Sequence, residues 1–221
     1  MIPDIASPLK RVAVFYDGSF FWQVSQYYAY ADRRKSFIDL RGLQNYIRSR
    51  VAAVETNKNE SLCQIVESHF FRGRFSLNAA KAASSLERDR LQDQILMHAG
   101  VVAHYYPMNE NVTPPEERGI DVWLALEAYD LAVHKRFDVM VLFAGDQDYV
   151  PLVRKVNGLG TRVLVLGVDL QYTDTHGQSR FHKTSPRLIE EASYTVMLTE
   201  EVDSQALRND RTVAGIFPHR A

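Results

Sequence analysis

The stretch Val12-Ala13-Val14-Phe15-Tyr16-Asp17-Gly18 decides the fold of this chain. It is a short apolar run, rich in β-branched and aromatic residues, that stops at an Asp-Gly turn signal. Two later runs, at 139–143 and 162–166, repeat the pattern and are followed closely by Gly145 and Gly167. Near-continuous apolar runs of this length are typical of strands that a parallel sheet buries on both faces.

Amphipathic stretches separate these runs and predict helices, because their apolar side chains recur every three or four residues. The predicted helices cover residues 38–54, 77–98, 120–134 and 149–158, and weaker strand candidates lie at 64–71 and 101–106. Strands that alternate with helices form right-handed βαβ units. We therefore expect a three-layer α/β/α fold with a central, mainly parallel sheet of Rossmann-like topology.

The composition excludes several classes of protein. The 221 residues include 26 Lys+Arg and 27 Asp+Glu, so the net charge of −1 argues against a histone-like protein and an acidic disordered tail. A single cysteine, Cys63, cannot form an internal disulfide or a cysteine-based metal cluster, and it favours a reducing compartment. No run is long and apolar enough to span a membrane and no signal peptide is visible, so we expect a soluble cytoplasmic protein without a membrane partner.

The domain organisation expected from the sequence is simple. Residues 11–199 form one domain, preceded by an extension over residues 1–10. Residues 200–221 are polar without periodicity, which predicts a loosely held tail. The segment 168–186 is polar and irregular, and a structureless loop of this length is usually functional or disordered.

Four aspartates fall where predicted strands end or a helix begins. Asp17 follows the first run, whereas Asp146 and Asp148 follow the run at 139–143. Asp121 opens the third predicted helix. Because the carboxyl ends of parallel strands share one sheet edge, we expect these carboxylates to gather there. Taken alone, Asp17 or Asp148 is better explained as a turn former or a helix cap, and Asp121 is equally explained as a helix-dipole partner, so only the joint pattern favours a site.

The joint pattern predicts a metal centre. Carboxylates that lie close together repel one another unless a cation neutralises them, and oxygen-only ligands favour Mg²⁺ or Mn²⁺. Such an ion activates water and holds phosphate oxygens. The chemistry that follows is phosphodiester hydrolysis.

Three motifs give the chain a resemblance to a known family. They are Val12-Ala13-Val14-Phe15-Tyr16-Asp17-Gly18-Ser19, Gly119-Ile120-Asp121-Val122-Trp123-Leu124, and Gly145-Asp146-Gln147-Asp148-Tyr149-Val150-Pro151-Leu152. Over residues 10–199 the chain resembles the NYN domain family, and more narrowly its LabA-like (DUF88) branch. The resemblance implies a PIN-like fold and metal-dependent ribonuclease activity. It also implies that Asp17, Asp121, Asp146 and Asp148 hold the metal and are catalytic.

One position departs from the family pattern. Phe20 stands where the family often has an asparagine after Asp-Gly-Ser, so a polar group that could orient a ligand or water is missing. Ser19 remains and could hold Asp17 or a phosphate. Two readings therefore stay open, an active ribonuclease and an inactive RNA-binding or regulatory module that keeps the acidic pocket.

Basic and aromatic residues predict a surface for RNA. Arg72 and Arg74 follow a predicted strand beside three phenylalanines, and Lys81 comes shortly after them. Arginine for phosphate and aromatic rings for bases is how single strands are bound. The structural alternative is that the arginines are solvated loop residues and the phenylalanines belong to the core.

We expect RNA rather than DNA as the partner, with Ser19, Arg72, Arg74 and Lys81 binding it. A phosphatase acting on small phosphate esters through the same metals is a third reading. Neither a dinucleotide-binding glycine motif nor a P-loop occurs, which argues against a nucleotide cofactor. The aromatic stretch 20–30 indicates either core packing or a subunit contact, so a homodimer stays open.

Overall fold

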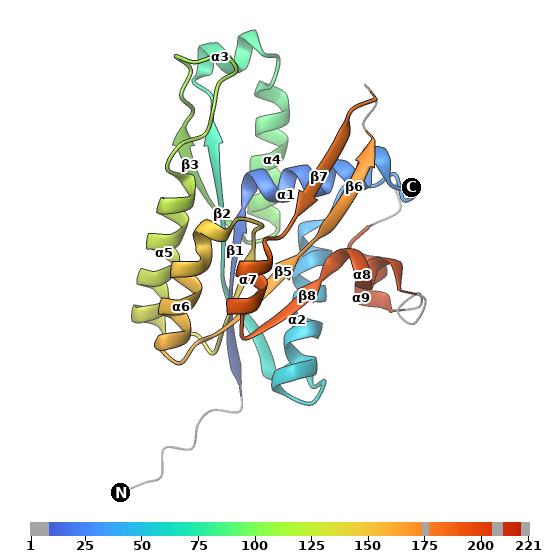
Figure 1. Cartoon of the computed structure of the whole chain (residues 1–221), viewed down its shortest axis with the longest axis vertical. Helices are drawn as coiled ribbons and strands as arrows, with labels where there is room; N and C mark the ends of the chain where they lie inside the picture. Colours follow the sequence, from blue (N-terminus) through green and yellow to red (C-terminus); the bar gives the residue numbers. More distant parts are fainter. Residues whose placement is uncertain (1–8, 174–176, 205–209, 218–221) are drawn as a thin grey trace, which may run out of the picture.

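A six-stranded parallel sheet carries the fold (Figure 1). The computed structural model describes residues 9–173, 177–204 and 210–217. The strands lie in the order β3 (Val102–Pro107), β2 (Cys63–Arg74), β1 (Lys10–Asp17), β4 (Val139–Phe143), β5 (Arg162–Gly167) and β8 (Tyr194–Met197). The expected three-layer α/β/α class is therefore confirmed, and the candidates at 64–71 and 101–106 are both strands.

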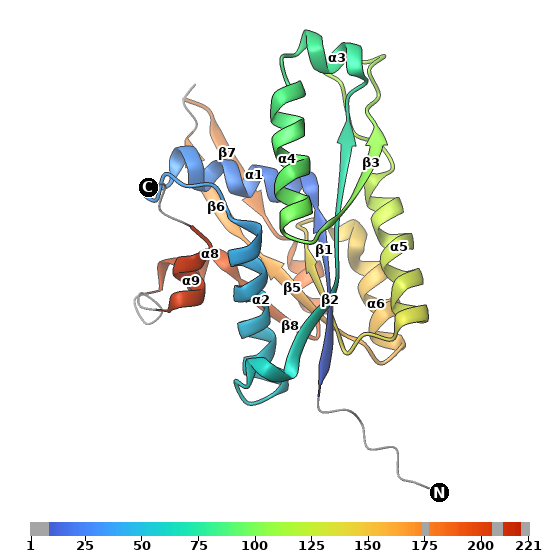
Figure 2. The same cartoon turned by 180° about the vertical axis from the view of Figure 1, so that it is seen from behind.

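Helices cover both faces of the sheet (Figures 1 and 2). One layer holds α1 (Gly18–Gln26), the π-helical turn η1 (Tyr27–Ala31), α2 (Leu40–Glu55) and α4 (Leu86–His98), with α8 (Leu198–Asp203) and α9 (Arg211–Gly215). The other holds α5 (Ile120–Lys135), η3 (Gln147–Tyr149), α6 (Val150–Gly158) and α7 (Pro186–Glu191). Two short elements, η2 (Glu60–Leu62) and α3 (Leu77–Ala82), complete the chain order.

The central strand β1 shows why the sequence folds in this way. Val12, Val14 and Tyr16 are fully buried in the core under α1 and α2. Ala13 and Phe15 are equally buried in the core under α5 and α6. Side chains of a strand alternate between the faces of the sheet, so a run without polar residues is stable only between two helical layers.

The strand order places a ligand crevice beside β1. The chain builds β2 and β3 on one side of β1 and then returns to place β4 on its other side. Crevices for ligands form where the order of parallel strands reverses in this way, outside the carboxyl ends of the strands. Here those ends carry Asp17 and Asp146.

Two predicted elements differ from the structure. The single helix expected over 77–98 is divided into α3 and α4, because Ser84 adopts a left-handed conformation with φ of 52°. The segment 168–186 contains an antiparallel hairpin of β6 (Asp169–Thr173) and β7 (Ser179–Lys183), so the expectation of an irregular loop was wrong there. Its mostly polar side chains hid the strands, since Leu170 alone in β6 is buried.

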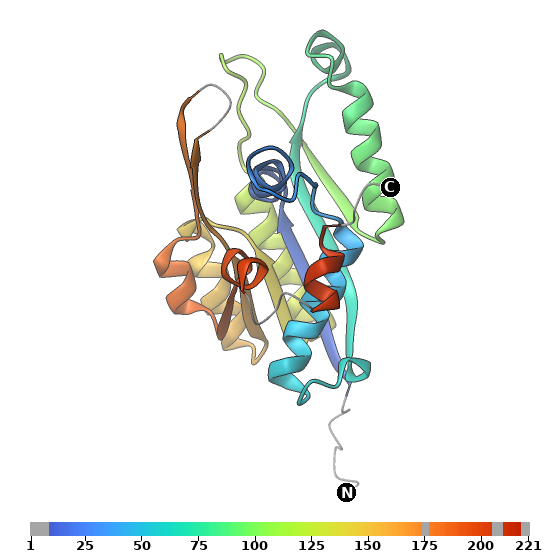
Figure 3. The ribbon, with the colours of Figure 1, turned by 90° about the vertical axis from the view of Figure 1, so that its right-hand side faces the viewer.

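The tail predicted over residues 200–221 is also packed more firmly than expected, as far as its residues are described. Val213, Ile216 and Phe217 are buried in the core beside α2, and the Phe217 ring lies 4.7 Å from the ring of Tyr28. In Figure 3 the helices α8 and α9 lie close to α2. Three apolar residues in and directly after the short helix α9 give too little periodicity for a prediction, but they suffice to cover one end of α2. No described helix combines the length and apolar character that a membrane span requires.

Candidate active site

Asp17 ends β1 and begins α1, which fixes its carboxylate. Its Oδ1 accepts hydrogen bonds from the backbone N–H groups of Ser19 and Phe20, both at 3.1 Å. Gly18 lets the chain pass close to β2, because a Cβ at this position would lie 2.5 Å from the carbonyl oxygen of Phe71. The carboxylate therefore caps the helix while only 8% of the residue stays exposed.

Tyr149 joins Asp17 to Asp121. Its hydroxyl lies 2.8 Å from Asp121 Oδ1 and 3.2 Å from Asp17 Oδ2. One hydroxyl carries one proton, so it cannot donate fully to both carboxylates at once. Burial, with the nearby charge of Asp121, raises the pKa of Asp17 to about 6. The same burial and the two carboxylates raise the pKa of Tyr149, which keeps its proton. Asp17 and Asp121 thus share a single hydroxyl proton, and a bound cation would stabilise their negative charges.

Asp146 and Asp148 follow β4 but occupy different surroundings. Asp146 lines the same pocket as Asp17 and Asp121, and its Oδ1 accepts the backbone N–H of Asp148 at 2.9 Å. Both aspartates are exposed, but Asp148 is not among the residues that line the pocket. The structure therefore brings three of the four predicted acids together, and the role of Asp148 stays a prediction.

Glu117 is a fourth acid of the pocket, and it is not among the residues predicted from the sequence. Its Oε2 accepts the hydroxyl of Ser19 at 2.5 Å, and its Oε1 accepts the backbone N–H of Gly73 at 2.8 Å. Glu117 lies in an irregular segment before α5, where no periodicity marks it. Its place two residues before the turn at Gly119, with φ of 76°, is the signal that could have found it.

Phe20 forms an apolar part of the same pocket. Its ring packs edge-on against Phe143 at 5.5 Å between centroids. A Cβ on Gly145 would come within 2.4 Å of that ring, so Phe20 and Gly145 are matched in size. The departure from the family pattern is therefore built into the packing at the end of β4.

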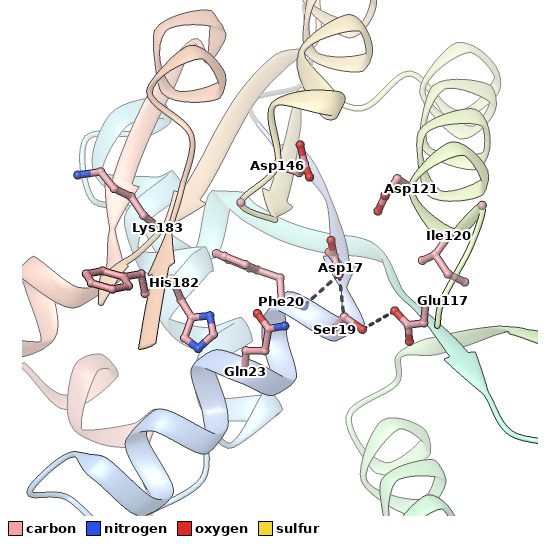
Figure 4. A pocket seen from close by; sticks show the side chains of 13 residues that line it. Asp17, Ser19, Phe20, Gln23, Glu117, Ile120, Asp121, Asp146, His182 and Lys183 are labelled. Carbon is pink, nitrogen blue, oxygen red and sulfur yellow. Dashed lines mark hydrogen bonds between the residues drawn. The ribbon is translucent and has the colours of Figure 1, made fainter. Parts of the chain in front are cut away.

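These side chains surround one cavity of about 420 Å³, here named the acidic pocket (Figure 4). Asp17, Glu117, Asp121 and Asp146 form its acidic wall. The opposite wall consists of Phe181, His182 and Lys183 from the hairpin β6–β7. The sequence marks the segment 168–186 as functional or disordered, and only the fold shows that the hairpin reaches this sheet edge. Its volume lies within the range of small-molecule sites in proteins.

The predicted RNA-binding arginines lie elsewhere. Arg72 and Arg74 line a separate cleft of about 80 Å³ against α4, here named the arginine cleft, which meets the acidic pocket at Glu117. Lys81 is exposed on α3 and lines neither space. Topology thus brought the arginines near the sheet edge but not into the acidic pocket.

Both arginines are already engaged by the protein. Arg74 donates to both carboxylate oxygens of Asp93, at 3.2 and 2.7 Å, and lies 4.3 Å from the ring centre of Tyr105. Arg72 donates to Gln92 at 2.7 Å and lies 5.4 Å from the ring centre of Trp22. Burial lowers the pKa of Arg72. Neither guanidinium is therefore the solvated loop group of the structural alternative, and the role of the two arginines in binding RNA stays a prediction.

The chemistry of the acidic pocket suits a divalent cation, although its geometry is open. All its acidic donors are carboxylate oxygens, which Mg²⁺ and Mn²⁺ prefer. Burial is the main cause of the raised pKa of Asp17, and among the described residues no Lys, Arg or His forms an ion pair with its carboxylate. Within the described ranges, however, no three His, Cys, Asp or Glu side chains form a group that could hold a metal ion as they stand. The donor set fits a cation in type, and the side chains are not closed around one.

Comparisons with known proteins agree with the geometry. The chain resembles a crystal structure of a protein of unknown function from Vibrio parahaemolyticus, with a TM-score of 0.56 and 19% identity. That match covers 87% of this chain and 94% of the other, and it supports the fold alone. A search of curated proteins gave no match. The family model of the NYN domain matches residues 11–199, and we conclude that this chain belongs to the NYN domain family.

Proposed function

We propose that this chain is a divalent-metal-dependent ribonuclease that cleaves phosphodiester bonds. NYN domains are generally nucleases that act on RNA. The observation that carries the proposal is the acidic wall, where carboxylates from the end of β1, the start of α5 and the end of β4 line one pocket. Three separate parts of the chain supply these acids, which a turn or a helix cap does not require.

The residues of the pocket have two kinds of role, metal binding and the positioning of other groups. Asp17, Asp121 and Asp146 would hold Mg²⁺ or Mn²⁺, which supplies an activated water and stabilises charge on the phosphate. Tyr149 orients Asp17 and Asp121 through its shared hydroxyl. Glu117 fixes Ser19 and the end of β2 through its two hydrogen bonds. Tyr149 therefore acts through the two carboxylates that it holds, whereas Glu117 acts through Ser19 and the backbone of β2.

The experiment is cleavage of a labelled single-stranded RNA by purified protein with Mn²⁺. We expect cleavage that chelation abolishes and that Asp146→Asn reduces to background. The matched control is Asp130→Asn, since Asp130 is an exposed residue of α5 that contacts His134. Full activity of Asp146→Asn after identical purification would overturn the proposal, because the activity would then come from elsewhere.

Phe20 favours a second candidate, an RNA-binding or regulatory module without turnover. Its ring fills the place of the polar group that the family often carries there, and Gly145 accommodates it. In that case RNA would bind with no cleavage across Mg²⁺, Mn²⁺ and other divalent ions. The variant Phe20→Asn, expected to restore cleavage under this reading, separates the two candidates.

Narrower assignments rest on the sequence. The LabA-like branch is proposed from the block Gly145-Asp146-Gln147-Asp148-Tyr149. RNA rather than DNA, the division at residues 11–199, the cytoplasmic location and a homodimer likewise stay predictions. A competition between RNA and DNA of the same sequence in the cleavage assay tests the first of these.

A further inference from the structure

The outer surface of α5 is apolar, although this helix lies at the surface of the molecule (Figure 1). Four apolar side chains recur along it at steps of four, three and four residues, with exposed fractions of 63%, 65%, 37% and 40%: Val122, Leu126, Tyr129 and Val133. The opposite side of the same helix packs into the core through Leu124, Ala128 and Ala132. A helix that is apolar on two opposite sides is stable between two layers, and the described residues supply a layer on one side only.

The apolar surface continues onto the edge of the sheet. β3 is the edge strand, and its residues Val102 and Tyr106 are about half exposed. His104 between them stacks on Phe71 at 4.2 Å in the core under α5, so strand alternation places Val102 and Tyr106 on the α5 side as well. The Tyr106 ring lies 6.0 Å from that of Trp123 in α5. With the four side chains of α5 they form a contiguous apolar surface, here named the α5 face, of a kind typical of protein interfaces.

The spacing along α5 fits a second copy of the same helix. Steps of four, three and four residues read the same in both directions, and residues at these steps form one seam on a helix. When two copies pack antiparallel about a two-fold axis, Val122 meets Val133 and Leu126 meets Tyr129, each pair occurring twice. A partner of different sequence would have to carry a matching seam, whereas the chain itself already has one.

The charges of α5 select the antiparallel arrangement. Its first turn carries Asp121, and its last turn carries His134 and Lys135. Antiparallel packing about the same axis brings Asp121 of one copy level with His134 of the other, and it opposes the two helix dipoles. Parallel packing would instead bring the two acidic ends together, with their Asp121 carboxylates side by side, and like charges in contact disfavour an interface.

The same arrangement brings a cation to the acidic pocket. Arg136 directly follows α5, is exposed, and forms no ion pair with a carboxylate in the part of the chain that the structure describes. In the antiparallel pair it lies level with Gly119 of the other copy, and Gly119 lines the acidic pocket. Arg72 and Arg74 are already engaged within their own chain, whereas Arg136 is not.

We propose that a second copy of this chain binds antiparallel along the α5 face, so that Arg136 of the partner subunit lies at the rim of each acidic pocket. The dimer follows from the surface alone. The role of the partner's Arg136, to hold a phosphate of the RNA beside the acidic wall, rests on the proposed function. Each copy thereby provides the acids of one site and a cation for the other.

The first test measures mass. In sedimentation equilibrium across micromolar concentrations, the full-length parent is expected at twice its chain mass of 25.3 kDa. Leu126→Glu is expected at the single mass, because it places a carboxylate against Tyr129 of the other copy. The control Met97→Glu changes an exposed apolar residue of α4, outside the α5 face, and should stay dimeric. A monomeric parent, or a Leu126→Glu variant that melts like the parent and dimerises as strongly, would overturn the proposal.

The second test determines the direction of packing. Cys63 is buried, so a short bis-maleimide crosslinker reacts with introduced cysteines. A mixture of Val122→Cys and Val133→Cys is expected to crosslink after the two variants exchange subunits, and neither variant should crosslink alone. Crosslinking of Val122→Cys by itself would show parallel packing and overturn the proposed arrangement.

The third test concerns Arg136 and RNA. In the Asp146→Asn background, Arg136→Ala should keep the dimer and lower the slope of log affinity against log salt by about 0.7, the value of one phosphate contact on a single strand. The control Lys58→Ala removes an exposed cation that precedes β2, at the opposite edge of the sheet, and should leave the slope unchanged. An unchanged slope in Arg136→Ala would overturn its role and leave the dimer standing. Absence of RNA binding by the parent would overturn the proposed function together with the role of Arg136, while the mass measurement decides the dimer independently.

Discussion

The acidic pocket and the arginine cleft lie side by side at one sheet edge, yet the fold treats their charges in opposite ways. In the cleft, Arg74 is paired with Asp93 and Arg72 is bonded to Gln92. In the pocket, Asp17 shares one tyrosine proton with Asp121 and keeps a raised pKa. Charge that the fold has already neutralised stabilises the fold, and charge that it leaves unpaired is available to a ligand.

The largest expected effect tests the pocket. Asp121→Asn should lower kcat/KM for RNA cleavage about a hundredfold or more, since removing even an outer partner of a metal site costs 10–100-fold. The change keeps the size of the side chain and an acceptor for Tyr149. Kinetics with Mn²⁺ measure the loss, and Asp130→Asn on the same helix is the control. An equal loss in the control would show that the effect is not specific to the pocket.

The second prediction concerns stability without metal. Asp17 has a folded pKa of about 6, above its ordinary value, so the folded state binds more protons and its stability falls as pH rises from about 4 to about 6. Asp17→Asn should remove most of this fall and raise the free energy of unfolding at pH 7 by about 2 kcal/mol.

Urea unfolding of both proteins in chelator, across that pH range, measures the difference. Asparagine keeps the helix cap, so the capping contribution stays nearly constant in the comparison. A variant that is less stable than the parent at pH 7 would mean that Asp17 is satisfied in the fold.

The third prediction addresses the arginine cleft. Arg74→Ala should destabilise the fold by about 1 kcal/mol, because it removes a bidentate ion pair and a contact with Tyr105. Arg74→Lys should restore little, since lysine lacks the planar fork. Urea unfolding gives the stability, and RNA binding in the Asp146→Asn background should change little. Lost RNA affinity that lysine restores would instead identify a phosphate contact.

The smallest expected effect is that of Asp148→Asn. Asp148 is exposed and lies outside the lining of the pocket, so kcat/KM should stay within about threefold of the parent value. Asp146→Asn is the matched comparison, because it makes the same substitution two positions away at a residue that lines the pocket. A loss as large as that of Asp146→Asn would restore Asp148 to the metal-binding set that the sequence predicts.

The apolar patterns of the sequence were enough to predict the strands and the helix that carry the aspartates of the site. The apolar runs predicted β1, β4 and β5, and parallel pairing of β1 with β4 then brings Asp17 and Asp146 to the same edge. Asp121 could be predicted as well, because a helix between parallel strands begins or ends at a sheet edge. These residues depend on periodicity and topology, which a sequence displays directly.

The rest of the site depends on contacts that no local pattern specifies. Glu117 bonds to Gly73, 44 positions away, and His182 reaches the pocket on a hairpin whose base is tied to Gly145 through Ser185. The partners of Arg72 and Arg74 come from α4, whose rotation about its axis the sequence does not reveal. Residue type and position along the chain therefore predicted where the arginines lie but not whether they are free.

The packing of α9 has a consequence for the order in which the protein matures. Val213, Ile216 and Phe217 belong to the same core as Val12 and Val14 of β1, although the family match ends at residue 199. During synthesis α1 and α2 can cover this face of β1 early, but one end of α2 stays uncovered until residue 217 has left the ribosome. A recombinant protein cut at the family boundary would leave Tyr28 and one end of α2 open to solvent, and we expect it to aggregate.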